Sequence, residues 1–162
     1  YPLDVLIYAT GFQWMATSSF NMVEGEESLK LSSKWKEEGT RTFLGIHTRG
    51  FPNLFLIAGP QGGGGSFNFT DAIDEHAEYV VWLLKTMKEN GKKRIDVLEE
   101  PEDDYTEHCR MADLSTRPLR DCVSYYNGHG DAQPGSLAYY GGGQWHKFRK
   151  RAQETLEPFI FA

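Results

Sequence analysis

The stretch from Leu54 to Met87 constrains the fold most, because an apolar run, a glycine turn and an amphipathic segment follow one another. Residues 54–58 (Leu-Phe-Leu-Ile-Ala) are an unbroken apolar run, which is typical of a strand buried on both faces. Residues 62–65 are four consecutive glycines, which expose their backbone N–H groups and tolerate positive φ angles. With a helix opening near Asp71, these elements predict a platform for a ligand that carries hydrogen-bond acceptors.

The glycine turn alone does not identify a ligand. It lacks the lysine and serine or threonine that end a phosphate-binding P-loop, and its spacing is not the G-x-G-x-x-G of a dinucleotide fingerprint. Glycine turns also commonly connect two elements without any further role. From the residues alone, a binding turn and a plain flexible connection are therefore equally supported.

The segment that follows the glycines has the clearest helical pattern in the chain. We expect a helix from Asp71 to about Glu89, with acidic side chains in its first turns and Lys88 near its end, in agreement with the helix dipole. Apolar residues recur at alternating four- and three-residue spacing and predict one buried stripe, formed by Ile73, Ala77, Val80, Leu84 and Met87.

The rest of the chain predicts further short elements around this helix. Residues 3–8 are a strand-like apolar run, residues 24–38 are polar and predicted to be exposed, and Leu29 and Leu31 alternate as in a short edge strand. A helix with Pro101 as its first residue is expected in the acidic region. The remaining predicted elements are a strand at 137–140, a helix at 144–156 and a strand at 159–161.

Composition excludes several classes of function. The net charge of −6 and the lack of a basic stripe argue against a nucleic-acid surface. No apolar stretch reaches membrane-spanning length, and the first residues, Tyr1 and Pro2, suggest a start inside a larger protein. Cys109 and Cys122 are too few for a disulfide framework, so we expect them to be thiols of a cytoplasmic protein. The histidines and cysteines do not have the spacing of metal ligands.

Six short motifs then follow one another in a familiar order. Residues 4–12 read DVLIYATGF, residues 40–45 read TRTFLG, and residues 50–60 read GFPNLFLIAGP. They continue with IDEH at 73–76, SYYNG at 124–128 and YGG at 140–142. Together, and across essentially the whole chain, these motifs resemble the Baeyer–Villiger monooxygenases, a group of class B flavoprotein monooxygenases.

The resemblance implies an α/β fold, namely the C-terminal portion of a Rossmann-like FAD-binding domain from a flavoprotein with two dinucleotide-binding domains. Residues 1–162 would form one segment of that FAD domain, with a mobile control loop at about residues 113–135. FAD and NADPH are implied as cofactors, and a ketone and O2 as substrates that yield an ester or lactone. The active-site arginine lies upstream in the family, so no catalytic residue is expected in this segment. It would work only with the upstream remainder of the same enzyme.

The resemblance also implies roles for individual residues. Thr10 and Gly11 would pack against FAD, and the backbone N–H groups of Asn68 and Phe69 would stabilise negative charge on the reduced flavin. Tyr125 falls where many family members carry a tryptophan that contacts the nicotinamide cofactor, although ordinary packing beneath a loop is an alternative for it.

Three neighbouring residues of the glycine turn, Gly64, Gly65 and Ser66, correspond to a variable wall of the substrate pocket in the family. Two other functions stay open. One is a flavin monooxygenase that oxygenates nitrogen or sulfur, and the other is a non-catalytic partner of a separate flavin-binding chain. The motif at residues 50–60 favours the ketone oxygenase.

Overall fold

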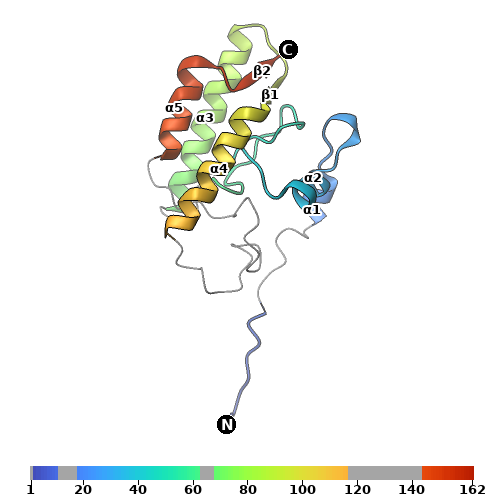
Figure 1. Ribbon diagram of the computed structural model, residues 1–162, viewed down its shortest axis with the longest axis vertical. Helices are drawn as coiled ribbons and strands as arrows, with labels where there is room; N and C mark the ends of the chain where they lie inside the picture. Colours follow the sequence, from blue (N-terminus) through green and yellow to red (C-terminus); the bar gives the residue numbers. More distant parts are fainter. Residues whose placement is uncertain (1, 11–17, 63–67, 117–143) are drawn as a thin grey trace.

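The computed structural model describes residues 2–10, 18–62, 68–116 and 144–162. Three long helices lie side by side and make up most of the body (Figure 1). They are α3 (Phe69–Glu89), α4 (Glu99–Thr116) and α5 (Gln144–Thr155). A smaller unit beside them holds α1 (Ser18–Met22), the 3₁₀ turn η1 (Glu26–Ser28) and α2 (Leu31–Glu38).

Two short strands close one end of the helical layer. β1 (Ile95–Val97) and β2 (Phe159–Phe161) pair antiparallel, with Ile95 opposite Phe161. β1 leads directly into α4, while β2 follows α5 through a turn at Pro158. The pairing therefore joins the start of α4 to the end of α5.

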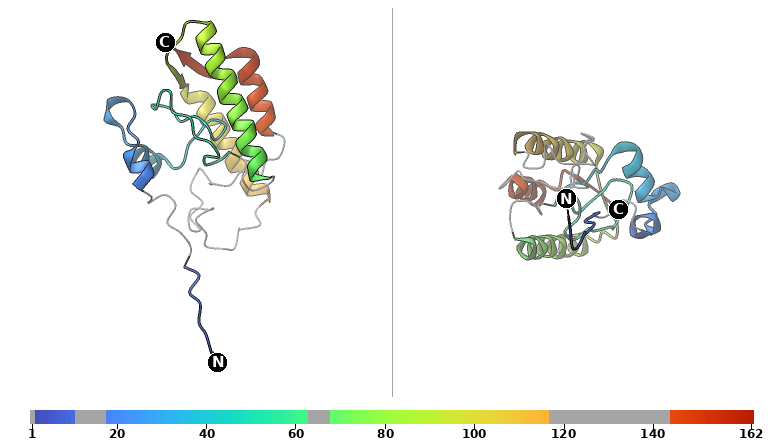
Figure 2. Two further views of the ribbon diagram at one scale, coloured as in Figure 1. Left: turned by 180° about the vertical axis from the view of Figure 1, so that it is seen from behind. Right: turned by 90° about the horizontal axis from the view of Figure 1, so that it is seen from below.

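An irregular segment, residues 40–62, runs between the helices instead of a sheet, as the end-on view in Figure 2 shows. Phe43 and His47 face each other in a tight turn, in which the Phe43 N–H donates to the His47 carbonyl at 2.8 Å. At its tip Gly45 has φ +69°, and a Cβ there would lie 2.3 Å from the Gly62 Cα, so only glycine fits.

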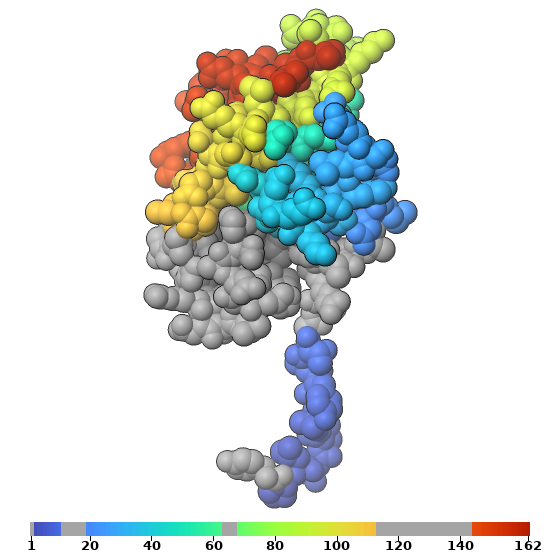
Figure 3. Space-filling view, turned by 45° about the vertical axis from the view of Figure 1, so that its right-hand side comes forward, coloured from blue at the N-terminus to red at the C-terminus, as the bar shows by residue number. Residues whose placement is uncertain are grey.

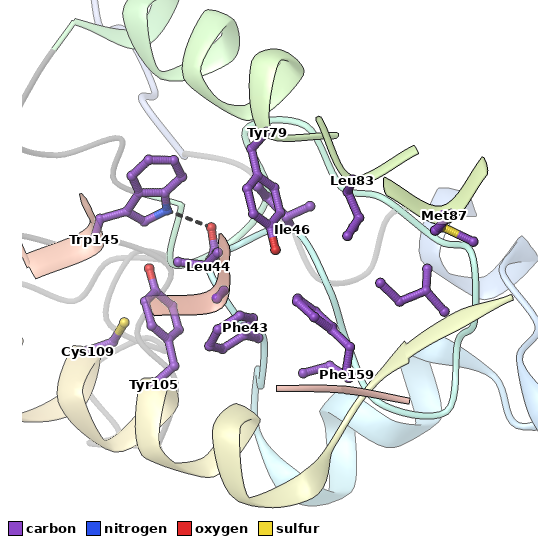
Figure 4. Close-up of a cluster of buried hydrophobic side chains, with 13 residues drawn as sticks. Phe43, Leu44, Ile46, Tyr79, Leu83, Met87, Tyr105, Cys109, Trp145 and Phe159 are labelled. Atoms are coloured by element: carbon purple, nitrogen blue, oxygen red, sulfur yellow. Dashed lines mark hydrogen bonds between the residues drawn. The ribbon is translucent and has the colours of Figure 1, made fainter. Parts of the chain in front are cut away.

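This tight turn supplies the centre of the core. Figure 4 shows its side chains pointing between the helices, and the Trp145 indole N–H donates to the Leu44 carbonyl at 2.9 Å. Burial of such large side chains stabilises the fold by roughly 1.5 to 3 kcal/mol each. The buried cluster consists of Phe43, Leu44, Ile46, Tyr79, Leu83, Met87, Ile95, Val97, Tyr105, Cys109, Trp145, Ala152 and Phe159.

The helix predicted from Asp71 to Glu89 is confirmed as α3 and begins two residues earlier, but the predicted stripe is wrong. Met87 is buried as expected, whereas Ala77 and Leu84 are exposed and Ile73 and Val80 are only partly buried. The buried face is rotated by one residue and uses Ala72, His76, Tyr79, Leu83 and Met87. His76 and Tyr79, which carry polar atoms, lie at the centre of this face, so a search for apolar residues alone did not detect it.

Two predicted strands are wrong. Residues 54–58 form turns and irregular backbone, bounded by positive φ angles at Asn53 and Ala58, and the Leu56 N–H donates to the Ile46 carbonyl instead of to a neighbouring strand. Residues 3–8 also form no strand and lie on an extended N-terminal arm, which projects from the body in Figure 3. An apolar run becomes a strand only when a partner strand satisfies its backbone, and the described residues offer none to either run.

The region predicted as polar and exposed, residues 24–38, differs from expectation as well. Leu31 begins α2 instead of ending an edge strand, and Leu31, Lys34 and Trp35 are buried. The helix predicted in the acidic region is confirmed as α4, but it begins at Glu99, so Pro101 is its third residue and not its first. The helix predicted at 144–156 is confirmed as α5, and β2 confirms the strand at 159–161. Cys109 is a free, buried thiol, as predicted, while Cys122 and the strand predicted at 137–140 lie outside the described residues.

The N-terminus of α3 is capped by one side chain, which gives a direct test of the helix start. Asn68 Oδ1 accepts a hydrogen bond from the Thr70 N–H at 3.0 Å. We expect Asn68→Ala to lower the free energy of unfolding by about 1 kcal/mol, because that N–H loses its acceptor. Urea unfolding checks this, with Asn68→Asp as a control that keeps the acceptor oxygen. Equal stability of Asn68→Ala and the unchanged chain would contradict the assigned cap.

Candidate functional site

The turn at residues 58–62, which ends at the first glycine of the run, is held by hydrogen bonds from buried side chains. The buried Gln61 side chain accepts hydrogen bonds from the Thr42 N–H at 3.1 Å and the Thr42 hydroxyl at 2.6 Å. Its amide nitrogen donates to the Thr40 carbonyl at 3.0 Å, and the Tyr105 hydroxyl donates to the Gln61 carbonyl at 2.8 Å. Gln61 has φ +63°, so these four bonds maintain a backbone conformation that is unfavourable for a residue with a side chain.

His76, on the second turn of α3, holds both ends of the same turn. Its Nδ1 accepts a hydrogen bond from the Ala58 N–H at 3.1 Å, and its Nε2 lies 3.2 Å from the Gly62 carbonyl oxygen. An accepting Nδ1 requires the neutral ring with its proton on Nε2, which then donates to Gly62. Burial lowers the pKa of His76 to about 4, against the smaller opposing effect of the Gly62 carbonyl. The imidazole stacks on Trp145 at 5.3 Å between ring centres.

The N-terminus of α3 follows residues 63–67 and is open to solvent. Asn68, Phe69, Thr70 and Asp71 are all exposed. Helix geometry leaves the first backbone N–H groups without an acceptor within the helix, and Asn68 supplies one only to Thr70. The N–H groups at this end, together with the helix dipole, favour a ligand with acceptor atoms or partial negative charge.

The structure places some of the predicted site residues. Asn68 and Phe69 lie at the N-terminus of α3, whereas Thr10 belongs to residues 2–10, an N-terminal arm that projects away from the helices (Figure 1). Residues 113–116 belong to α4, so the predicted control loop at 113–135 begins too early, and its remainder lies outside the described residues. The other predicted site residues also lie outside them, namely Gly11, Gly64, Gly65, Ser66 and Tyr125.

The interpretation of the sequence missed the residues that support this site. Gln61 directly follows Gly59-Pro60, and His76 ends the IDEH motif, so both were within recognised segments. Neither sequence segment indicates that the Gln61 or His76 side chain is buried and forms hydrogen bonds with the backbone of a distant segment. Trp145, which fixes the His76 ring, is separated from it by 69 positions in the chain, and no local signal links the two.

Other kinds of site have less support within the described residues. A cavity of about 240 Å³ lies between α4 and α5 and is lined in part by Leu98, Phe148 and Pro158, but no predicted site residue lines it. The described part of the chain contains no group of three or more potential metal ligands. None of its helices combines the length and apolar character needed to cross a membrane.

Comparison with known proteins finds several monooxygenases among the relatives of this chain. No family model matches the chain. The 2-oxo-Δ(3)-4,5,5-trimethylcyclopentenylacetyl-CoA monooxygenase of Pseudomonas putida is 32% identical over an alignment that covers 96% of this chain and 29% of the relative. A Baeyer–Villiger monooxygenase of Streptomyces coelicolor is also 32% identical, with 95% of this chain and 26% of the relative covered.

Solved structures agree with the sequence comparison. The crystal structure of OTEMO in complex with FAD and NADP matches with a TM-score of 0.79 and 29% identity, and covers 100% of this chain and 31% of that one. The chain therefore spans less than a third of the length of each of these three relatives. The described fold corresponds to part of a larger flavoprotein fold of this kind.

Proposed function

The chain is homologous to a segment of the Baeyer–Villiger monooxygenases, and on that premise we propose that it forms part of the FAD-binding domain of such an enzyme. The complete enzyme would use FAD, NADPH and O2 to insert one oxygen atom into a small-molecule ketone and release an ester or lactone. One observation carries the proposal, namely a structural alignment with OTEMO that spans the whole length of this chain at 29% identity and a TM-score of 0.79.

The α3 N-terminus has the donor chemistry that a flavin ring requires. The ring presents nitrogen and carbonyl oxygen acceptors, and Asn68 and Phe69, both exposed residues, offer backbone N–H donors at the positive end of a helix dipole. These residues therefore fit FAD and would hold the ring edge. When bound, FAD would supply the redox chemistry and the reaction with O2, while this chain supplies placement and electrostatics.

The remaining roles are part of the same proposal. Thr10 and Gly11 would contact FAD by close backbone approach, and Tyr125 would contact the nicotinamide of NADPH. Gly64, Gly65 and Ser66 would line the ketone pocket, and the loop that follows α4, up to about residue 135, would close over NADPH. The active-site arginine would come from the upstream remainder of the enzyme. We place the enzyme in the cytoplasm, without a membrane or nucleic-acid partner.

Exposed apolar side chains support the proposal that this chain packs against the remainder of the enzyme. The N-terminal arm exposes Leu3, Val5, Leu6, Ile7 and Tyr8, each between 61 and 82% accessible. Contiguous apolar residues in such numbers mark surfaces that another protein segment covers. Three apolar side chains of α3, Phe69, Val81 and Leu84, are about half exposed as well. Both surfaces would be buried by other parts of the FAD domain, the arm by joining a sheet as an added strand.

Product analysis on the complete protein that carries this chain tests the proposed reaction. With FAD, NADPH and isotopically labelled O2, we expect a ketone panel to yield esters or lactones that contain one labelled oxygen. Omission of NADPH is the control and should abolish product. Labelled amine or sulfide oxides without any ester would favour the nitrogen- or sulfur-oxygenating class. A flavin-loaded protein that oxygenates nothing would contradict both enzyme functions.

A further inference from the structure

The first part of α3, residues 69–78, contributes no large apolar side chain to the core. Within these residues only Ala72 and His76 are buried, whereas the core side chains of α3 lie between Tyr79 and Met87. Apolar packing therefore fixes the later part of the helix more than its beginning. The position of the α3 N-terminus depends on the other contacts that residues 69–78 make.

The helix α5, which lies beside α3 (Figure 2), supplies such contacts from two of its residues. The Arg149 guanidinium forms an ion pair with Glu75 and lies 3.7 Å from a carboxylate oxygen of Glu78. One turn earlier on α5, Trp145 stacks on His76 with 5.3 Å between ring centres and 14° between the planes. The Arg149 guanidinium carbon lies 5.6 Å from the centre of the Trp145 ring. Two residues of α5 thus contact three residues in the second and third turns of α3.

Arg149 differs from a neighbouring arginine of α5 in both burial and partner. Its side chain is 16% exposed, whereas the Arg151 side chain is 70% exposed and pairs at 3.6 Å with Glu157, which follows the same helix. Water and salt screen a half-buried ion pair less than an exposed one. The planar guanidinium can also serve two carboxylates in a fixed geometry. Arg149 therefore orients α3 relative to α5, and Arg151 does not.

The backbone of α3 connects this ion pair to the proposed flavin site without any other segment. The helix is continuous from Phe69, and Glu75 lies about 9 Å along its axis from that residue. The Ala72 N–H donates to the Asn68 carbonyl at 3.1 Å, so the capping residue belongs to the same hydrogen-bonded unit. A displacement of Glu75 therefore displaces the N–H groups of Asn68 and Phe69. The placement of such donors decides how strongly they act on a bound ring.

We propose that Arg149 is a positioning residue for the flavin site, which fixes the first turns of α3 against α5 through its ion pair with Glu75. The inference rests on the proposed function, because the site that it positions is the proposed FAD site. Arg149 does not need to contact FAD for this role. It acts through the Glu75 carboxylate and the backbone of α3.

Substitutions in the complete protein test the role of this ion pair. Arg149→Met keeps an apolar stem and removes the cation, and we expect it to raise the FAD dissociation constant about fivefold, which corresponds to about 1 kcal/mol. Arg149→Lys keeps the positive charge and should recover part of that loss. Arg149→Met combined with Glu75→Gln should lose little more affinity than Arg149→Met alone, because both changes break one ion pair. Arg151→Met, which removes the same charge from an exposed site on α5, is the matched control and should leave FAD affinity unchanged.

Hydrogen exchange of residues 69–78, followed by mass spectrometry without added FAD, provides a second readout. We expect faster exchange in Arg149→Met than in Arg151→Met. Faster exchange with unchanged FAD affinity would reduce Arg149 to a structural residue and overturn the positioning role, as would an equal loss of affinity in Arg151→Met. If the unchanged complete protein binds no FAD, the proposed function itself fails. If it binds FAD and Arg149→Met binds equally tightly, only the positioning role fails.

Discussion

Acidification from pH 7 to pH 5 is expected to lower the free energy of unfolding by about 4 kcal/mol, because two buried histidines must stay neutral in the fold. His47 is fully buried among aromatic rings, with Phe159 at 5.1 Å and Tyr79 at 5.8 Å between ring centres, and burial lowers its pKa to about 3. Within the described residues its Nε2 has no hydrogen-bond partner, so nothing stabilises a proton there. His76 has a pKa of about 4, again lowered by burial.

The direction of the effect follows from proton binding. Both imidazoles in the unfolded chain titrate near pH 6.5, whereas in the folded chain they titrate only near pH 3 and 4. Above about pH 6.5 neither state carries these protons and stability does not depend on them. Between pH 6.5 and 4 the unfolded chain binds up to about two more protons than the folded chain, so the free energy of unfolding falls by up to about 2.7 kcal/mol per pH unit. Burial raises the pKa of Asp96, which acts in the opposite direction.

Urea unfolding followed by circular dichroism at pH 7, 6 and 5 measures this dependence. Since domains of this size are stable by only about 5 to 15 kcal/mol, the chain should approach its acid transition at pH 5. His47→Phe places a ring of similar size in the same aromatic cluster and should halve the slope between pH 6 and 5. Equal stability at pH 7 and pH 5 would show that these histidines are not buried.

The second large effect concerns a buried ion pair. The Lys34 ammonium donates to both oxygens of the Glu102 carboxylate at 3.0 and 2.9 Å, to the Thr48 hydroxyl at 3.1 Å and to the Arg49 carbonyl at 2.9 Å. The Lys34 and Glu102 side chains are only 2 and 1% exposed. Burial lowers the pKa of Lys34, and Glu102 opposes that shift. The pair connects α2 to α4 across 68 positions of the sequence.

Lys34→Met is expected to lower the free energy of unfolding by about 3 to 5 kcal/mol, because the Glu102 carboxylate remains buried without its cation. The Arg49 N–H, which donates to the same carboxylate at 2.8 Å, offsets part of that loss. Lys34→Met combined with Glu102→Leu should recover most of the stability, since two apolar side chains then replace the two charges. A double-mutant cycle by urea unfolding measures the coupling.

An exposed pair provides the comparison for this cycle. Lys30 and Glu24 also form a salt bridge, but both side chains are more than 40% exposed. Lys30→Met should therefore change the free energy of unfolding by less than about 1 kcal/mol. A loss for Lys34→Met no larger than that for Lys30→Met would contradict the burial of the Lys34–Glu102 pair.

Local patterns in the sequence identified α3, α4 and α5, but they missed α2 and predicted the wrong buried face for α3. α3, α4 and α5 carry periodic apolar residues, acidic first turns or clear stops, which depend only on neighbours in the chain. The choice between the aliphatic stripe of α3 and the neighbouring face with His76 and Tyr79 depends on what packs against it. That partner is the tight turn around Leu44, whose positive φ angle and inward side chains no periodicity indicates.

The two strand predictions failed for a related reason. The runs at 3–8 and 54–58 have strand composition, but pairing requires neighbours that the described residues do not contain. The candidate site was predictable only where it is built from local backbone, at Asn68 and Phe69. The hydrogen bonds of the Gln61, His76 and Lys34 side chains join residues 14 to 68 positions apart. Only the folded structure therefore reveals them.

The visible absorbance of the purified complete protein, recorded together with the intact mass of every chain in the sample, tests the central claim most directly. The proposed FAD-domain assignment predicts a yellow protein with stoichiometric flavin, and a colourless sample when this 162-residue chain is purified alone. A complete protein that stays colourless and takes up no added FAD would contradict the assignment of this chain to a flavin-binding domain.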